Sequence, residues 1–279
     1  MKKLLLSDDG IFPITKNFDG NFVTKMPLTG FSFAGTIQGE GKLAGTPSLF
    51  IRLSGCNLNC IWKLPEGNLS KCDTCHLPNN KKNREMSVEK AVKTINQNLG
   101  SLKHIVITGG EPLLQKETIE KLAADLKSKT NAHLTLETNG TIFNEKIFKY
   151  IDLCSISPKL KNSIPLNEES ETNIANFGKY NKTRINIDVL QSFIDSAKKY
   201  GKDIQFKFVV ANINDENEIK DILLQLTNYS DSDIMIMPLG ANIKEMEQTQ
   251  LIAVKIAVKN GWRFSPRLQI NLFNNLKGV

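Results

Sequence analysis

The sequence predicts an α/β fold in which helices cover a mostly parallel sheet. Three observations lead to it: strand-length segments alternate with amphipathic helical segments, the strand segments are continuously apolar, and turn residues follow them in phase. The expected strands span residues 49–53, 104–108, 133–137, 152–156, 204–210 and 233–237. The expected helices span residues 87–99, 113–129, 143–150, 185–200, 215–228 and 245–260. Six strands are too few for a closed eight-stranded barrel, so we expect a partial (βα) barrel, with a doubly wound sheet as the alternative.

The composition is that of an ordinary globular protein. Of the 279 residues, 40% are hydrophobic and 23% are charged, which excludes a disordered or collagen-like chain and allows one or two domains. The net charge of +7 suits an anionic ligand or nucleic acid. No cluster of lysines and arginines with interleaved aromatic residues supports nucleic-acid binding, so we expect no stable nucleic-acid partner.

Residues 1–30 contain no convincing periodic run and are rich in Gly, Pro, Asp and Lys. We expect them to form an N-terminal extension, followed by one core domain over residues 31–279. The apolar run that starts at Leu4 stops before Asp8, short of the roughly 7–15 residues of a signal-peptide core. No stretch approaches the roughly 18 apolar residues of a transmembrane helix. We therefore expect a cytoplasmic protein without membrane association.

Polar and turn residues follow four of the predicted strands. Each motif is compatible with an ordinary turn, but in parallel α/β folds the ligands bind at the C-terminal ends of the strands. Four such motifs on the same edge therefore favour a binding site. They are Thr108-Gly109-Gly110-Glu111, Thr138-Asn139-Gly140, Ser157-Pro158-Lys159 and Pro238-Leu239-Gly240.

Four of the five cysteines lie close together, with the spacing Cys56-x3-Cys60-x11-Cys72-x2-Cys75. In a chain long enough to need no disulfides, such clustering indicates metal binding. Zinc ribbons pair two Cys-x2-Cys knuckles, and only the second pair here has that form. Thiolates suit both zinc and iron–sulfur clusters. Spacing alone leaves a four-cysteine zinc site and a three-cysteine cluster equally open.

At these residues the sequence resembles a known family. The Cys56-x3-Cys60 pair, a third cysteine and the preceding segment 50–53 are similar to the radical S-adenosylmethionine (SAM) superfamily, which implies a partial (βα)6 barrel of the radical SAM type. From about residue 35 to its end, the chain resembles the 7-carboxy-7-deazaguanine synthase family. The matching stretches are 36–41 (TIQGEG), 45–47 (GTP), 50–53 (FIRL), 55–58 (GCNL), 72–74 (CDT), 107–113 (ITGGEPL), 137–141 (ETNGT), 157–159 (SPK) and 277–279 (KGV).

The resemblance implies that Cys56, Cys60 and Cys72 bind a 4Fe-4S cluster. The family usually has two residues between the second and third ligands, whereas this chain has eleven. The Asp-Thr pair after the third ligand sets the register and leaves Cys75 outside the set. A rival set is Cys56, Cys72 and Cys75, with Cys60 structural. We expect residues 61–71 to form an inserted cluster loop that turns outward at its Pro and Gly.

The resemblance also implies a SAM site beside the cluster, where cleavage of SAM produces the radical that starts the reaction. The two glycines allow the backbone to approach the methionyl amine, and Glu111 is expected to help position that amine. The residues implied in SAM binding are Lys71, Cys72, Asp73, Gly109, Gly110, Glu111, Thr138, Asn139, Ser157, Pro158 and Lys159.

The implied reaction converts 6-carboxy-5,6,7,8-tetrahydropterin to 7-carboxy-7-deazaguanine with loss of ammonia, in the pathway to queuosine and other 7-deazapurines. Thr74 is the implied Mg²⁺ ligand. Gln38 and Glu40 suit the guanidine-like edge of a pterin, and Arg52 suits its carboxylate; with Thr108 they are the candidate catalytic residues. The candidate substrate contacts are Ile37, Gln38, Gly39, Arg52, Thr108, Arg267 and Gln269.

By resemblance, the expected partners are the pterin, an electron donor such as flavodoxin or ferredoxin, and a second copy in a homodimer. Two alternatives remain: another radical SAM enzyme such as an activase, and a zinc-stabilised nucleic-acid-binding protein. His104 and His133 each begin a strand and are expected to be structural, and Cys154 is expected in the core. The alternation around Lys207 does not decide whether its side chain faces the barrel interior or solvent.

Overall fold

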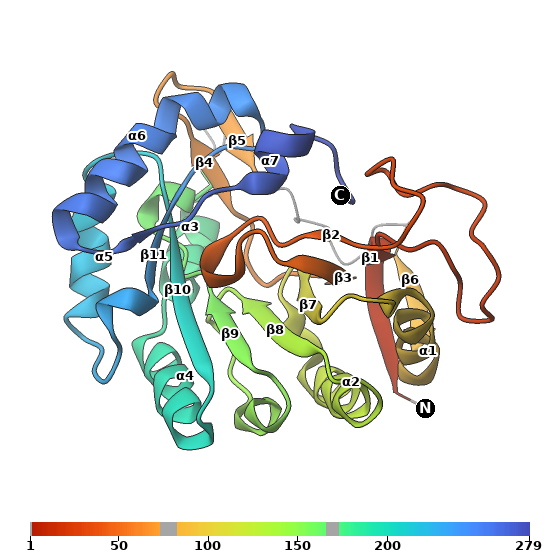
Figure 1. Ribbon diagram of the computed structural model, residues 1–279. Helices are drawn as coiled ribbons and strands as arrows, with labels where there is room; N and C mark the ends of the chain where they lie inside the picture. Colours follow the sequence, from red (N-terminus) through yellow and green to blue (C-terminus); the bar gives the residue numbers. More distant parts are fainter. Residues whose placement is uncertain (1, 73–82, 166–172) are drawn as a thin grey trace.

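A largely parallel, curved sheet forms the centre of the computed structural model, which describes residues 2–72, 83–165 and 173–279 (Figure 1). Its strand order is β12-β11-β10-β9-β8-β7-β3-β1-β6, with parallel pairing from β12 to β3. All six predicted strands are present within two residues of their expected ends, which confirms the α/β class and the partial-barrel arrangement. The parallel strands are β3 (Pro47–Leu53), β7 (His104–Gly109), β8 (His133–Thr138), β9 (Leu153–Ile156), β10 (Asp203–Val210), β11 (Ile234–Pro238) and β12 (Arg263–Phe264).

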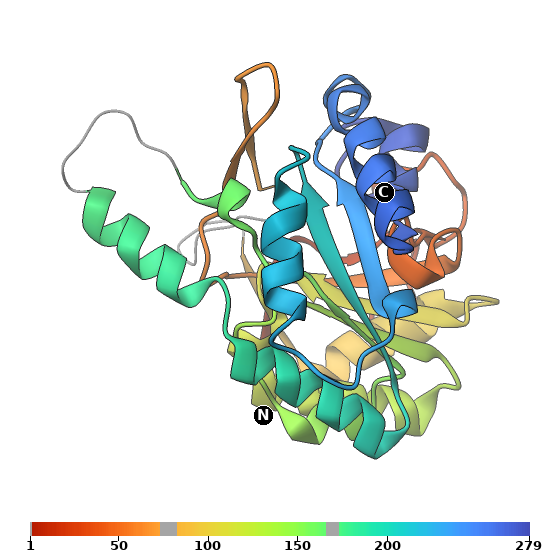
Figure 2. The ribbon, with the colours of Figure 1, turned by 90° about the vertical axis from the view of Figure 1, so that its left-hand side faces the viewer.

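Helices cover the outer face of the sheet (Figures 1 and 2). They are α1 (Val88–Leu99), α2 (Lys116–Lys129), α4 (Ile187–Tyr200), α5 (Asp215–Leu223) and α6 (Ile243–Asn260). Ser87 caps α1 by accepting a hydrogen bond from the Lys90 N–H, as the sequence predicts. The expected helix over 143–150 is instead a short 3₁₀ turn, η3 (Glu145–Lys149). Two helices that the sequence did not predict are α3 (Asn173–Thr183) and α7 (Leu268–Phe273).

The remaining short elements connect these layers. The 3₁₀ turns are η1 (Gly41–Leu43), η2 (Pro112–Gln115), η4 (Lys161–Ser163) and η5 (Asp231–Asp233), and the two-residue strand β2 (Thr36–Ile37) pairs with β3. Within the described part of the chain, no helix has the length and apolar character needed to cross a bilayer.

Each parallel strand sends alternate side chains to opposite faces of the sheet. In β10, Ile204, Phe206 and Phe208 belong to the main hydrophobic core, whereas Lys207 between them lines the central cavity. The structure thus resolves the orientation that the sequence left undecided. The same alternation brings other strand residues to this inner face: Phe50, Arg52, Thr108, Glu137, Ser155 and Met237.

The expectation of an irregular N-terminal extension is wrong for residues 3–12. They form β1 (Lys3–Phe12), which pairs antiparallel with β3 on one side and with β6 (Arg84–Ser87) on the other. Leu4, Leu6 and Ile11 are buried in the main core. The pairing register shifts between Leu6 and Ile11. This irregularity breaks the two-residue alternation that identifies a strand in a sequence.

The inserted segment 61–71 is a β-hairpin rather than a simple outward turn. Strand β4 (Ile61–Lys63) pairs antiparallel with β5 (Leu69–Lys71). Trp62 and Leu64 are 7% and 3% exposed, and they join a second apolar cluster with Cys60 and Tyr180. The insertion is therefore packed beside the cysteines. Its three-residue strands are too short to give a periodic sequence signal.

Candidate active site

A cavity of about 500 Å³ opens at the C-terminal ends of the parallel strands. Strands β3 and β7 to β11 form its sides, and residues 274–279 at the C-terminus complete the lining. The structure brings most of the sequence-predicted site residues together here. Those that line the cavity are Ile37, Gln38, Gly39, Glu40, Arg52, Cys56, Cys60, Cys72, Thr108, Gly109, Gly110, Thr138, Asn139, Ser157, Lys159, Arg267 and Gln269.

Five predicted site residues are not found on the cavity lining. Glu111 and Pro158 are buried outside it. Lys71 ends strand β5, and only its backbone is described. Asp73 and Thr74 lie outside the described residues, as do Cys75 and His76. The expected contacts of Asp73 with SAM and of Thr74 with Mg²⁺ therefore stay predictions.

Cys56, Cys60 and Cys72 line one side of the cavity, which we call the cysteine wall. Cys60 is only 3% exposed, and its carbonyl accepts a hydrogen bond from the Cys72 N–H at 3.4 Å. Burial raises the pKa of the Cys56 thiol and raises that of Cys60 to about 12. Thiolates at such sites need a positively charged centre to stabilise them. A metal cluster fits this donor set.

Gly109 and Gly110 hold the cysteine wall against β7. A Cβ atom on Gly110 would lie 2.1 Å from the Gly55 carbonyl oxygen and 3.0 Å from the Cys56 Cβ. Gly109 has a φ of +142°, and a Cβ there would lie 2.2 Å from the Leu53 carbonyl oxygen. Both positions thus exclude a side chain because the loop that begins the cysteine wall packs directly on their backbone.

Glu111 connects two of the strand-end loops. One carboxylate oxygen accepts hydrogen bonds from the Leu113 N–H at 2.9 Å and the Thr138 hydroxyl at 2.9 Å, and the other accepts from the Asn139 N–H at 2.7 Å. Burial raises the pKa of Glu111 to about 7, although these three donors oppose the rise. From behind the cavity lining, Glu111 thus positions the two loops. Its expected help in positioning the SAM amine stays a prediction.

Asn139 extends this connection to the first cysteine. The side-chain nitrogen of Asn139 donates a hydrogen bond to the side-chain oxygen of Asn57 at 2.9 Å. The same nitrogen lies 3.9 Å from the Cys56 sulfur. On the next strand end, the Lys159 ammonium donates to the Ser157 hydroxyl at 2.7 Å. Asn139, Ser157 and Lys159 thus supply an amide, a hydroxyl and a positive charge beside the cysteine wall.

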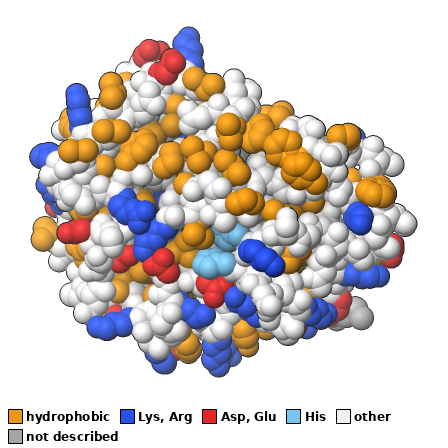
Figure 3. Space-filling view, viewed as in Figure 1, with side chains coloured by type: hydrophobic (Ala, Val, Ile, Leu, Met, Phe, Trp, Pro, Cys, Tyr) orange, Lys and Arg blue, Asp and Glu red, His pale blue; other side chains and the backbone are white. Residues whose placement is uncertain are grey.

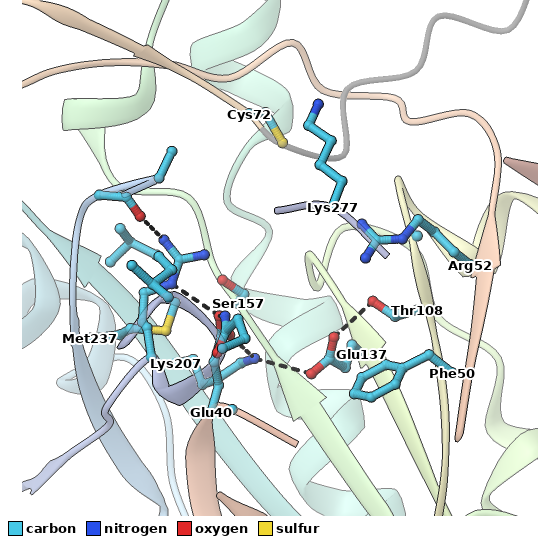
Figure 4. A pocket seen from close by; sticks show the side chains of 18 of the residues that line it. Glu40, Phe50, Arg52, Cys72, Thr108, Glu137, Ser157, Lys207, Met237 and Lys277 are labelled. Atoms are coloured by element: carbon cyan, nitrogen blue, oxygen red, sulfur yellow. Dashed lines mark hydrogen bonds and ion pairs between the residues drawn. The ribbon is translucent and has the colours of Figure 1, made fainter. Parts of the chain in front are cut away.

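Glu40, Glu137, Lys207 and Arg267 form a second group, which we call the charged floor (Figure 4). The Lys207 ammonium lies 2.9 Å from a Glu40 oxygen and 3.2 Å from a Glu137 oxygen. The Arg267 Nε lies 3.1 Å from the other Glu40 oxygen. The Lys207 side chain is only 5% exposed. Two positive and two negative charges therefore balance at the inner end of the cavity.

The charges of the floor stabilise one another. Burial opposes the ionisation of Glu40, but the nearby charges of Lys207 and Arg267 outweigh it and hold the Glu40 pKa below its usual range. Burial also opposes the charge on Lys207, but Glu137 and Glu40 outweigh it and raise the Lys207 pKa. Glu40 and Lys207 are therefore both charged near neutral pH while this network is intact.

Neutral side chains orient the two carboxylates. The Thr108 hydroxyl donates to Glu137 at 2.7 Å, and the Gln38 amide donates to Glu137 at 3.3 Å. The Gln269 amide donates to Glu40 at 2.8 Å, while the Gln269 carbonyl oxygen is buried without a hydrogen bond. Gly39 makes this approach possible, because a Cβ there would lie 1.6 Å from that oxygen. The unpaired Gln269 oxygen can accept a hydrogen bond from a ligand.

Arg52 projects into the pocket from β3, on the side across from Glu40 and Lys207 (Figure 4). Its guanidinium stacks over the Phe12 ring at 4.9 Å, and its Nε lies 3.4 Å from an Asp9 oxygen without making a hydrogen bond. Both contacts come from β1, which the sequence interpretation left out of the domain. A planar guanidinium held in this way is suited to binding a carboxylate.

The sequence analysis missed Glu137, Lys207, Tyr180 and the contribution of residues 274–279 as site features. Glu137 ends a strand within a matched motif, and Lys207 interrupts an apolar strand, so both gave usable signals. Tyr180 gave none, because its helix was not predicted. On the face seen in Figure 3, Lys and Arg are interspersed with Asp and Glu rather than gathered into one basic patch.

Comparisons with known proteins agree with this site. The model of the radical SAM superfamily matches residues 50–250. A 7-carboxy-7-deazaguanine synthase of Halobacterium salinarum is 35% identical over 246 residues, covering 86% of this chain and 88% of the relative. One of Rhodopirellula baltica is 32% identical over 242 residues, covering 87% of this chain and 85% of the relative.

A solved structure supports the same fold. The crystal structure of QueE from Escherichia coli matches with a TM-score of 0.55 at 20% identity and covers 91% of this chain and 93% of that one. Three observations agree on the family of this chain. They are its sequence relatives, the superfamily match and the position of the three cysteines in the cavity. The chain belongs to the 7-carboxy-7-deazaguanine synthase family of the radical SAM superfamily.

Proposed function

We propose that this protein converts 6-carboxy-5,6,7,8-tetrahydropterin to 7-carboxy-7-deazaguanine with loss of ammonia, and so supplies the synthesis of queuosine and related 7-deazapurines. The names of its relatives support the reaction. The observation that carries the proposal is the arrangement of one cavity, in which a wall of three cysteines faces a floor of paired charges. The wall suits a redox cofactor, and the floor suits a polar, flat substrate.

Cys56, Cys60 and Cys72 would hold a 4Fe-4S cluster, with SAM beside Gly109, Gly110 and the Ser157–Lys159 pair. When bound, the cluster and SAM supply the radical that removes a hydrogen atom from the substrate. The protein's own residues keep this chemistry away from water. Cys60, Leu58 and Trp62 are each at most 7% exposed, and residues 274–279 close part of the cavity.

The charged floor would bind the pterin. Carboxylates such as Glu40 and Glu137 accept hydrogen bonds from the N–H groups of a guanidine-like ring edge, and the buried Gln269 oxygen offers one more acceptor. Arg52 would pair with the substrate carboxylate from the other side. Lys207 holds both glutamates in position, since its ammonium lies within 3.2 Å of each, and its charge lowers the pKa of Glu40. These contacts orient the ring toward the cysteine wall.

Further components belong to the same proposal. Mg²⁺ on Thr74 would help to orient the substrate carboxylate, because Mg²⁺ prefers oxygen ligands and commonly retains waters. A one-electron donor such as flavodoxin or ferredoxin would reduce the cluster. A homodimer is the expected assembly by family resemblance.

An anaerobic turnover assay tests the proposal. The reconstituted protein is incubated with carboxytetrahydropterin, SAM, a reductant and Mg²⁺, and 7-carboxy-7-deazaguanine is identified by mass spectrometry. We expect product only when SAM and reductant are both present, and less product when Mg²⁺ is omitted. A protein that carries the cluster and cleaves SAM but forms no product would overturn the assigned substrate. A colourless zinc protein would overturn the radical chemistry as well.

A further inference from the structure

One cysteine of the wall receives a hydrogen bond from a tyrosine that no sequence motif identified. The Tyr180 hydroxyl, on helix α3, donates to the Cys60 sulfur at 3.0 Å. The two residues are 120 positions apart, and they are 7% and 3% exposed. Tyr180 also packs in the second apolar cluster with Trp62 and Leu64 of the inserted hairpin. The contact is thus buried and held by packing on both sides.

A second oxygen competes for the Tyr180 proton. The Ser163 hydroxyl donates to the Leu160 carbonyl at 2.6 Å, and that carbonyl also accepts the Ser163 N–H at 3.0 Å through its second lone pair. The Ser163 Oγ, 3.0 Å from the Tyr180 oxygen, is therefore an acceptor for Tyr180. An anionic cysteine sulfur is the stronger acceptor for the one Tyr180 proton, because charge-assisted hydrogen bonds are stronger than neutral ones.

We propose that Tyr180 is a positioning residue that sets the reduction potential of the iron–sulfur cluster through its hydrogen bond to the Cys60 sulfur. The inference depends on the proposed function, which makes Cys60 a cluster ligand. Reduction adds negative charge to the cluster, and part of that charge resides on the cysteine sulfurs. A hydrogen bond to one of these sulfurs stabilises the reduced state more than the oxidised state and raises the potential.

The test uses Tyr180→Phe in the full-length, anaerobically reconstituted protein. Phenylalanine keeps the ring in the apolar cluster and removes only the hydroxyl. The potential is measured by redox titration, followed by visible absorbance and by electron paramagnetic resonance of the reduced cluster. We expect the variant to keep the wild-type iron content and to have a more negative potential. An unchanged potential at full iron content would overturn the proposal.

Two further variants make the result decisive. Tyr200→Phe removes a hydroxyl that donates to Glu145 at 3.2 Å, outside the cavity lining, and should leave the potential unchanged. Ser163→Ala leaves Tyr180 in place, removes the competing acceptor and should raise the potential by a smaller amount. If Tyr180→Phe fails to retain iron, Ser163→Ala carries the test, and a potential no higher than that of wild type would overturn the proposal.

The failure of this inference can be distinguished from failure of the proposed function. The potential is measured without pterin, so it does not depend on turnover. If the wild-type protein binds no iron, the assignment of the cysteine wall is wrong. If the wild-type protein binds iron and forms product while the Tyr180→Phe potential is unchanged, only the role of Tyr180 is wrong.

Discussion

The two sides of the cavity are built in opposite ways. The cysteine wall is made from one short stretch of chain, residues 56–72, and its thiols lie in surroundings that disfavour their charge. The charged floor joins residues that are far apart in sequence: Lys207 pairs with Glu40 across 167 positions, and Arg267 pairs with Glu40 across 227. There the charges stabilise one another.

This difference separates two tasks within one site. Burial raises the pKa of the Cys56 and Cys60 thiols although the nearby Lys159 charge opposes the rise, so three thiolates at the cysteine wall would need the added positive charge of a metal cluster. The charged floor is already neutral as a whole, so it favours a neutral ligand edge that exchanges hydrogen bonds with it. We therefore expect changes at the wall to affect cofactor retention and changes at the floor to affect substrate binding.

The largest expected effect is the loss of the cluster at the cysteine wall. Cys72→Ala removes one of the three proposed ligands, and a water molecule in its place would bind iron much more weakly than a thiolate does. We expect the variant, purified anaerobically, to be nearly colourless and to contain little iron. Iron analysis and the visible absorbance spectrum measure the effect.

Cys75→Ala is the matched control, because it removes the neighbouring thiol and should retain the brown colour with about four irons. If Cys75→Ala loses the cluster and Cys60→Ala keeps it, the rival set of Cys56, Cys72 and Cys75 is correct. The cysteine wall would then have to be redefined.

At the charged floor, Lys207→Met should lower stability and substrate affinity without loss of iron. Removing one partner from a buried ion pair costs about 3–5 kcal/mol, because Glu137 would lose its ammonium partner and Glu40 would keep only Arg267. The KM for the pterin should rise about tenfold or more, since a charge-assisted hydrogen bond contributes about 1.5–3 kcal/mol. Urea denaturation and steady-state kinetics measure the two effects.

Lys42→Met provides the comparison for Lys207→Met. Lys42 also bridges two carboxylates, Asp203 at 2.6 Å and Asp233 at 2.7 Å, but it lies outside the cavity lining. It should lower stability and leave the KM near the wild-type value. Equal KM values for wild type and Lys207→Met would contradict the role of the floor in substrate binding.

The dependence of stability on pH should reveal Glu111 behind the cysteine wall. The pKa of Glu111 is raised to about 7 in the folded protein, whereas it is near 4.5 in the unfolded chain. Its preference for the proton in the folded state therefore stabilises the protein fully below pH 4.5. This stabilisation is lost as the pH rises through 7. The stability of wild type relative to Glu111→Gln should therefore fall by about 3 kcal/mol between pH 4.5 and pH 8. Urea denaturation of both proteins at several pH values measures this difference.

The comparison with Glu111→Gln is needed because His104 acts in the opposite direction. Burial lowers the His104 pKa to about 4, so stability from His104 falls as the pH drops from about 6.5 toward 4. This contribution is present in both proteins and cancels in the difference. A difference that does not change with pH would show that Glu111 is ionised throughout, held so by its three hydrogen-bond donors.

The smallest expected effect comes from a single methyl group. Gly110→Ala would push against Gly55 and Cys56, and overpacking of this kind costs about 1–3 kcal/mol. Gly178→Ala, in helix α3 with no heavy atom within 4 Å of the added Cβ, should be neutral or slightly stabilising. Thermal unfolding compares them. If both variants match wild type, the cysteine wall is not fixed by close packing on β7.

Sequence alone predicted the parts of the site that are formed by residues close together in the sequence. The clustering of the cysteines indicated metal binding, and the family resemblance then named Cys56, Cys60 and Cys72; the strand-end loops at Gly109, Asn139 and Ser157 were identified by their phase with the strands. His104 and His133 stay away from the cavity lining, as expected. Strand β1 was missed because its register shift interrupts the alternation. The inserted hairpin was missed because each of its strands has three residues.

The charged floor was predicted only in part, for a physical reason. Glu40 and Arg267 were named as separate candidates, but their pairing depends on where the chain closes in space. Lys207 was visible as a charge within an apolar strand, yet its direction depends on which face of β10 the helices cover. Contacts across 167 or more positions are set by topology, and no local pattern encodes them.

Our central claim is that the cysteine wall binds the cofactor and the charged floor binds the substrate. Two assays on the same three proteins test it most directly. Wild type, Cys72→Ala and Lys207→Met are assayed anaerobically for reductive cleavage of SAM without substrate and for formation of 7-carboxy-7-deazaguanine with substrate. We predict both activities for wild type, neither for Cys72→Ala, and SAM cleavage without efficient product formation for Lys207→Met. Product formation by Lys207→Met with the wild-type KM, or SAM cleavage by Cys72→Ala, would contradict this account.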